Sequence, residues 1–215
     1  MKEAEWLGTR DALQLLPAVE HVVTSRKLRL FMVACCWSGW RHYGLPAVVN
    51  LLETAERNAE DQTARAGREP GRHRQNPVWF WGIPVEQLLC PQGQELSAVR
   101  AFLTALQSSS PPYFGDAARV AELVSEQRVT RAALFRDVVG NPYQRVELSP
   151  DWLTSTVIQI ARGMYRFRDF SAMPILADAL QEAGCDSDEV LNHCRDPKQV
   201  HFRGCWVVDL LLGKE

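Results

Sequence analysis

The stretch SRKLRLFMVACCWSGW, from Ser25 to Trp40, decides the fold class of this chain. Ser25 is a favourable N-cap, and the side chains from Leu30 to Trp37 are apolar on every side of the helix that would follow. A helix that is apolar all round has to be buried among other helices. The stretch therefore predicts a central helix with further helices packed around it.

Helical periodicity continues along the rest of the chain, where apolar residues recur with a spacing close to 3.6. The only segment that resembles a strand is YQRVEL, from Tyr143 to Leu148, and its alternation is weak. We therefore predict an all-α, multi-helix bundle that forms a single domain over residues 1–215, with a possible subdivision near 110–115. The predicted helices lie within 45–61, 94–107, 116–139, 155–165, 171–183 and 186–194, with a last helix that carries Phe202, Trp206 and Leu210.

A long segment rich in Arg, Gly and Pro, DQTARAGREPGRHRQNP at 61–77, interrupts this pattern and predicts a flexible excursion. Aromatic residues follow it directly in VWFWGIP. Guanidinium groups bind phosphate and carboxylate, and aromatic rings stack on bases, so the region is a candidate surface for an acidic partner. The alternative, which we favour for the rings, is a solvated loop followed by aromatic side chains in the core. The candidate partner-binding residues are Arg65, Arg68, Arg72, Arg74, Trp79 and Trp81.

Composition limits the function classes. The chain has 215 residues and a net charge of −2, so no overall field would attract nucleic acid or an acidic membrane surface. We find no signal peptide and no apolar run of about 20 residues, and we expect a cytoplasmic protein that does not bind membranes. Its six cysteines should then be free thiols.

Three cysteines and a histidine near the C-terminus could bind a metal. Cys185, Cys194, His201 and Cys205 would supply the Cys₃His set of many zinc sites, and a helix would place His201 and Cys205 on one face. Each cysteine also has an explanation by packing alone, which we favour. Cys185 would follow the helix-ending Gly184, and the other two would face the core. We therefore expect no cofactor, with zinc as the alternative, and the absence of a CxxC motif argues against a redox pair.

Catalytic motifs are missing from the sequence. It contains no GxSxG, HExxH or GxGxxG, and LGKE at the C-terminus lacks the glycine-rich loop and hydroxyl of a phosphate-binding loop. Absent motifs do not exclude an enzyme, because catalytic groups often converge from distant positions. The sequence names no catalytic residue and favours a non-enzymatic role.

Two parts of the chain resemble a known family: RKLRLFMVACCWSGW near the start, and the end from RDVVGNPYQRVEL to HFRGCWVVDLLLGKE. They are similar to a family of uncharacterised paralogous proteins abundant in planctomycete bacteria. That family usually has a CACCRRxW-type helix, where this chain has Val33 in place of the first cysteine and Trp37 and Ser38 in place of the arginines. The resemblance implies a shared fold in a bacterial cell and no particular activity.

These observations favour a non-catalytic helical interaction or adaptor module whose partner is another protein. Two other hypotheses stay open: a zinc-stabilised or metal-sensing domain that uses the C-terminal Cys/His cluster, and a nucleic-acid-binding accessory protein that uses the Arg-rich loop.

Overall fold

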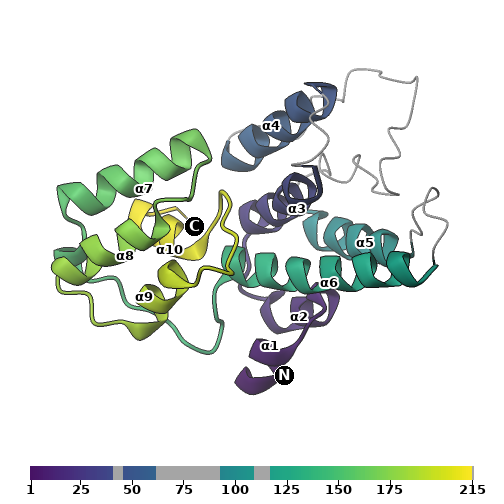
Figure 1. Cartoon of the computed structure of the whole chain (residues 1–215), viewed down its shortest axis with the longest axis horizontal. Helices are drawn as coiled ribbons and strands as arrows, with labels where there is room; N and C mark the ends of the chain where they lie inside the picture. Colours follow the sequence, from purple (N-terminus) through teal and green to yellow (C-terminus); the bar gives the residue numbers. More distant parts are fainter. Residues whose placement is uncertain (41–45, 62–92, 109–116, 215) are drawn as a thin grey trace. The chain divides into compact units, whose positions relative to one another are not determined.

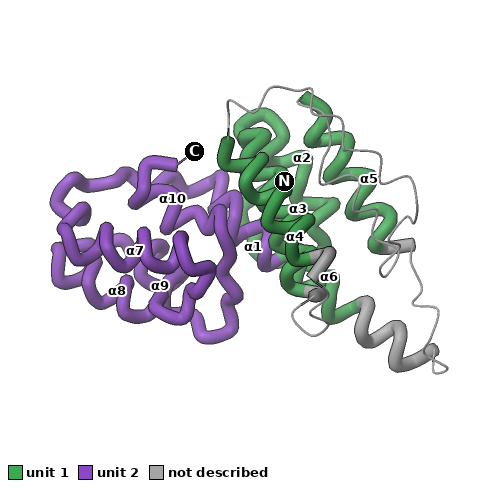
Figure 2. The backbone as a smooth tube through the Cα atoms, turned by 90° about the horizontal axis from the view of Figure 1, so that it is seen from above, with its two compact units in different colours: residues 1–132 green, residues 133–215 purple. Residues whose placement is uncertain are grey.

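The computed structural model describes residues 1–40, 46–61, 93–108 and 117–214, and Figure 1 shows their helices. All regular secondary structure in these residues is helical, which confirms the predicted all-α fold. None of the described helices is both long and apolar enough to cross a membrane. The chain divides into two compact units, residues 1–132 and 133–215 (Figure 2). The division lies inside helix α6 (Ala117–Val139), beyond the subdivision near 110–115 that the sequence suggests.

The first unit is built around the helix predicted from Ser25 to Trp40. This helix, α3, contacts both α4 and α5, and its side chains from Leu30 to Cys36 are buried. The prediction of a central buried helix is therefore confirmed. The other helices of this unit are α1 (Glu3–Gly8), α2 (Ala12–Val19), α4 (Pro46–Glu60) and α5 (Glu95–Ser108), together with the first part of α6.

Two ion pairs fix the polar start of α3 to its neighbours. Arg26 contacts Glu60 of α4 at 2.7 Å, and Arg29 contacts Glu95 of α5 at 2.8 Å. Burial alone would raise the pKa of Glu95, but the hydrogen bond from Arg29 outweighs it and holds the pKa below its usual value. Glu95 is thus an ionised, buried partner of Arg29, and the pair links α3 to α5.

The second unit contains the C-terminal end of α6 and four further α-helices that surround one hydrophobic core. Its core includes Val157, Leu176, Leu180 and Val207, none of which is exposed to solvent. The helical elements after α6 are η2 (Pro150–Trp152), α7 (Ser155–Phe167), α8 (Met173–Glu182), α9 (Asp188–Arg195) and α10 (Trp206–Leu212).

The end of α8 has the geometry that the sequence predicts for Gly184 and Cys185. Gly184 has a φ of +86°, its N–H donates to the carbonyl of Gln181 at 3.0 Å, and the N–H of Cys185 donates to Leu180 at 2.9 Å. These two hydrogen bonds define a Schellman motif. Cys185 is buried in the core of the second unit together with Leu180, as its position in this motif predicts.

The segment from Tyr143 to Leu148, the only one whose sequence resembles a strand, does not form one. These residues adopt turns and irregular backbone between α6 and η2. A strand needs a partner for its backbone N–H and C=O groups, and none of the described residues forms one. The alternation in this segment instead reflects Val146 and Leu148, which pack against the core of the second unit.

Candidate metal centre

Four side chains with metal-binding atoms meet inside the second unit: Asp137, His193, His201 and Cys205. One donor atom from each lies within 4.8 Å of all the others. Among the residues that the structure describes, no other group of three or more His, Cys, Asp or Glu side chains meets in this way. We call these residues the four-residue cluster.

The members of the cluster come from the ends of three helices. Asp137 lies in the last turn of α6 and His193 in the last turn of α9. His201 lies in the connection between α9 and α10, and Cys205 is the N-cap of α10. The sequence suggested that one helix would carry both His201 and Cys205, but the helix begins only after Cys205.

A tight turn brings Cys205 close to His201, whereas the sequence suggested that both lie on one face of a helix. The N–H of Cys205 donates to the carbonyl of Phe202 at 3.0 Å, and Gly204 between them has a φ of +96°. A positive φ at this position of a turn favours glycine, because a Cβ would be strained there. The turn leaves Cys205 Sγ 3.7 Å from His201 Nδ1.

The carboxylate of Asp137 is at the centre of the contacts. Its Oδ1 lies 2.7 Å from His201 Nδ1 and 3.2 Å from His193 Nε2. Its Oδ2 accepts a hydrogen bond from the backbone N–H of Phe202 at 3.2 Å. Cys205 Sγ completes the group at 3.3 Å from His193 Nε2. Every donor atom of the cluster therefore faces the same small volume.

Burial sets the charges of the cluster. The side chain of Asp137 is 0% exposed and that of His201 5%. Burial alone would raise the pKa of Asp137, but hydrogen bonds to His193 and His201 lower it to about 2, so the carboxylate is ionised. Burial, and then the nearby charge of Asp137, raises the pKa of Cys205 well above its usual value. The thiol therefore ionises only if a positive charge enters the cluster.

Four of the six distances between donor atoms are close to those of a tetrahedral metal site. Zinc bonds of about 2.0–2.3 Å imply roughly 3.3 Å between two N or O ligands and roughly 3.6 Å between N and S. The observed O–N distances are 2.7 and 3.2 Å, and the N–S distances are 3.3 and 3.7 Å. The other two of the six distances between donor atoms are no longer than 4.8 Å, so the four atoms would have to move together by up to about 1 Å to bind one ion.

The structure brings together two of the four residues that the sequence singled out as metal ligands. His201 and Cys205 belong to the cluster, whereas Cys185 and Cys194 are buried members of the hydrophobic core. All three cysteines are free thiols. The thiol of Cys194 behaves as a buried apolar group, since burial raises its pKa to about 12.

Sequence reasoning missed Asp137 and His193. Asp137 is an acid in the last turn of a helix, where the helix dipole disfavours negative charge, and it stands between Phe135 and Val138. A carboxylate in that position, on a face that the apolar neighbours bury, needs a cationic or hydrogen-bonding partner, and this signal could have identified it. His193 carries no such signal, because histidine is favourable in the last turn of a helix.

The cluster also contains the residue types of a Cys-His-Asp catalytic triad, but its environment does not suit one. A nucleophilic cysteine needs a lowered pKa and access to substrate. Cys205 has a raised pKa and is 0% exposed. The donor atoms converge, but a substrate could not reach the thiol. The cluster is therefore better suited to binding an ion than to attacking a substrate.

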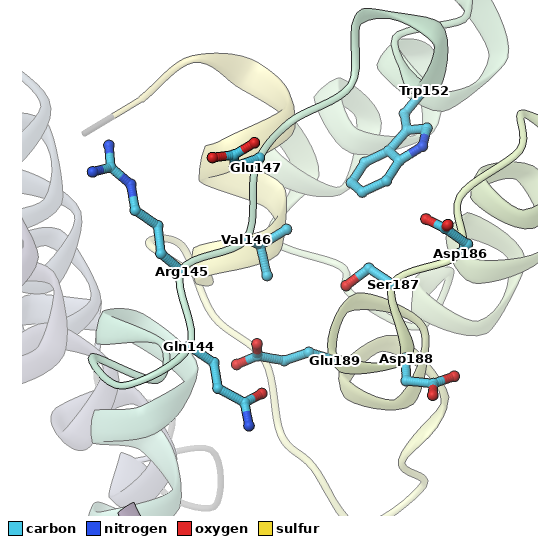
Figure 3. A pocket seen from close by; sticks show the side chains of 9 residues that line it. All are labelled: Gln144, Arg145, Val146, Glu147, Trp152, Asp186, Ser187, Asp188 and Glu189. Atoms are coloured by element: carbon cyan, nitrogen blue, oxygen red, sulfur yellow. The ribbon is translucent and has the colours of Figure 1, made fainter.

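The second unit also has an open surface groove of about 500 Å³, separate in residues from the cluster. Figure 3 shows the carboxylates of Glu147, Asp186, Asp188 and Glu189 around it, with Trp152 among the lining residues. Asp188 and Glu189 lie in the first turn of α9, where the helix dipole stabilises their negative charge. The position of Asp188 and Glu189 in this turn explains their presence, so no ligand is needed to account for them.

Comparison with protein-family models, with curated proteins and with solved structures finds no match for this chain. The resemblance to the planctomycete family therefore stays a prediction. The candidate partner-binding residues in the Arg-rich segment and its aromatic continuation lie outside the described residues: Arg65, Arg68, Arg72, Arg74, Trp79 and Trp81.

Proposed function

We propose that the C-terminal unit binds one zinc ion through the four-residue cluster and that the ion stabilises the fold of this unit. The observation that supports the proposal is the convergence of four donor atoms within 4.8 Å, from three buried residues and the partly buried His193. Convergence of this kind is uncommon without a ligand, because each polar group loses hydration when it is buried.

The donor types favour zinc over other common ions. Calcium and magnesium prefer a shell made of oxygen atoms, whereas this cluster offers two imidazoles, one thiol and one carboxylate. Zinc accepts nitrogen, sulfur and oxygen together and takes four ligands in a tetrahedron. It would also supply the positive charge that the thiol of Cys205 needs in order to ionise.

A structural role follows from the number of ligands and their burial. A catalytic zinc keeps one position open for water or substrate, whereas four protein ligands fill a tetrahedron. Asp137, His201 and Cys205 are buried, so water has little access to the ion. The ion would connect the end of α6, the end of α9 and the start of α10. The connection before α10 has no regular structure, and His201 would anchor it.

The proposal is tested by zinc titration of chelator-treated protein in competition with a chromophoric chelator. We expect one zinc per chain, and Cys205→Ala should weaken binding by more than the ten- to 100-fold typical of an outer-shell residue. Cys194→Ala is the matched control, since it removes a buried thiol outside the cluster, and it should bind zinc as the wild type does. At a free zinc concentration about 100 times Kd, the ion should stabilise the wild type by about 2.7 kcal/mol.

Two results would overturn the proposal: failure of the wild type to bind zinc, or equal losses of affinity in Cys205→Ala and Cys194→Ala. The adaptor role and the nucleic-acid role stay predictions from the sequence. A zinc-stabilised unit is compatible with either, because the ion would support the fold and leave the surface free for a partner.

A further inference from the structure

The ring nitrogen of His193 that points away from the cluster, Nδ1, contacts the indole of Trp206. The indole Nε1 of Trp206 donates a hydrogen bond to His193 Nδ1 at 3.2 Å, and the two rings lie 5.2 Å apart. An indole N–H can only donate. His193 Nδ1 therefore accepts, and the ring proton of the neutral histidine is on Nε2, the atom that faces Asp137 and Cys205.

This arrangement is the reverse of what a metal-binding histidine needs. A histidine that binds a metal through one nitrogen carries its proton on the other nitrogen and donates it to a carboxylate, a carbonyl or water. If zinc binds His193 Nε2, the proton is on Nδ1 and points at the N–H of Trp206. Two donors then face each other, so the hydrogen bond present in the metal-free protein has to break.

The side chain of Trp206 is held close to its position. A Cβ built on Gly140 would lie 3.2 Å from Trp206 Cγ, so the base of the indole packs directly on the backbone that follows α6. Trp206 is nevertheless only partly buried, so a water molecule could accept a hydrogen bond from its N–H in place of His193. The rearrangement therefore costs one hydrogen bond and needs no opening of the core.

We infer that Trp206 lowers the zinc affinity of the cluster, because its hydrogen bond adds to that of Asp137 in favouring the His193 tautomer whose Nε2 carries a proton and cannot bind a metal. The inference rests on the proposed function and makes Trp206 a positioning residue. Zinc binding then releases the thiol proton of Cys205 to solvent, and His201, whose Nδ1 faces Asp137 in the metal-free protein, would carry its ring proton on Nε2 instead. His193 exchanges its Nε2 proton for one on Nδ1, so the number of protons on its ring does not change. The hydrogen bond from Trp206 therefore makes zinc binding weaker than the same four ligands would give without it.

The first test is the tautomer of His193, measured from ¹⁵N chemical shifts of the histidine rings by NMR. In the metal-free wild type, we expect the proton on Nε2. With one equivalent of zinc, we expect it on Nδ1, together with a shift of the indole N–H signal of Trp206. A metal-free His193 with its proton on Nδ1 would overturn the inference, and this measurement needs no variant.

The second test is zinc affinity by chelator competition in Trp206→Phe, which keeps an aromatic ring and removes the N–H. Loss of one hydrogen bond that favours the metal-free state should tighten zinc binding roughly three- to tenfold. Trp152→Phe is the matched control, because Trp152 belongs to the core of the same unit and is not part of the cluster. It should leave the affinity unchanged.

The outcomes separate this inference from the proposal on which it rests. If the wild type and Trp206→Phe bind zinc equally well, or if the variant binds more weakly, Trp206 does not oppose zinc and the inference is wrong while the zinc site stands. If neither protein binds zinc, the proposed function fails and the inference fails with it.

Discussion

Replacing Asp137 with alanine should destabilise the metal-free protein by about 3–5 kcal/mol, as expected when one partner of a buried charged network is removed. Three donors point at the carboxylate: His201 Nδ1 at 2.7 Å, His193 Nε2 at 3.2 Å, and the N–H of Phe202 at 3.2 Å. Each donor left without an acceptor costs roughly 1–3 kcal/mol. Partial relaxation keeps the total below the upper sum, because His193 can reach solvent more easily than the other two.

The measurement is urea unfolding in the presence of a chelator, followed by far-UV circular dichroism. Asp137→Asn keeps one acceptor oxygen and should lose less stability than the alanine variant. Asp178→Ala is the control, since its carboxylate is 71% exposed and pairs with Arg195 at 2.9 Å on the surface. An exposed pair of this kind contributes about 0–1 kcal/mol.

The reasoning would be refuted if Asp137→Ala lost no more stability than Asp178→Ala. That result would mean that the three donors find other acceptors at little cost, and that the four-residue cluster does not hold the second unit together in the absence of metal.

Two further predictions concern backbone packing and acid stability. Gly184→Ala should lower the free energy of unfolding by about 1–2 kcal/mol through backbone strain alone, because its φ of +86° is left-handed and the new Cβ would meet nothing within 4 Å. Gly140→Ala should lower it by roughly 1 kcal/mol more, because Trp206 also has to move. Equal losses in urea unfolding would contradict this packing. The lowered pKa of Glu95 means that the stability from its pair with Arg29 is complete above the usual pKa of 4.5 and is lost as the pH falls through the lowered value. Glu95→Gln should remove this part of the pH dependence of unfolding, and an unchanged profile would count against the pair.

The helical fold was predictable because its signals are local. The apolar run from Leu30 to Trp37 predicts burial on all sides, and the structure buries Leu30 to Cys36 and partly buries Trp37. The end of α8 was also predicted correctly, since Gly184 and Cys185 form the two hydrogen bonds of a Schellman motif. The weak alternation of Tyr143–Leu148 resembles a strand, but alternation over a few residues does not show whether a second strand is available.

Only two of the four cluster residues were predicted from the sequence, because the contacts of the cluster are not local. Asp137 and His201 are separated by 64 residues, and no pattern in the sequence connects them. Cys185 and Cys194 are near His201 along the chain, but the ends of α8 and α9 direct them into the hydrophobic core. His201 and Cys205 were found through their spacing of four residues, although a turn at Gly204, and not a helix, brings them together.

The central claim is tested most directly by an X-ray absorption spectrum at the zinc edge of zinc-loaded wild-type protein. We predict four ligands, one sulfur at about 2.3 Å and three nitrogen or oxygen atoms at about 2.0–2.2 Å. A shell with three sulfur atoms would instead match Cys185, Cys194 and Cys205 together with His201, and would contradict the site described by Asp137 and His193. A protein that retains no zinc after loading would contradict the claim that this unit binds the ion at all.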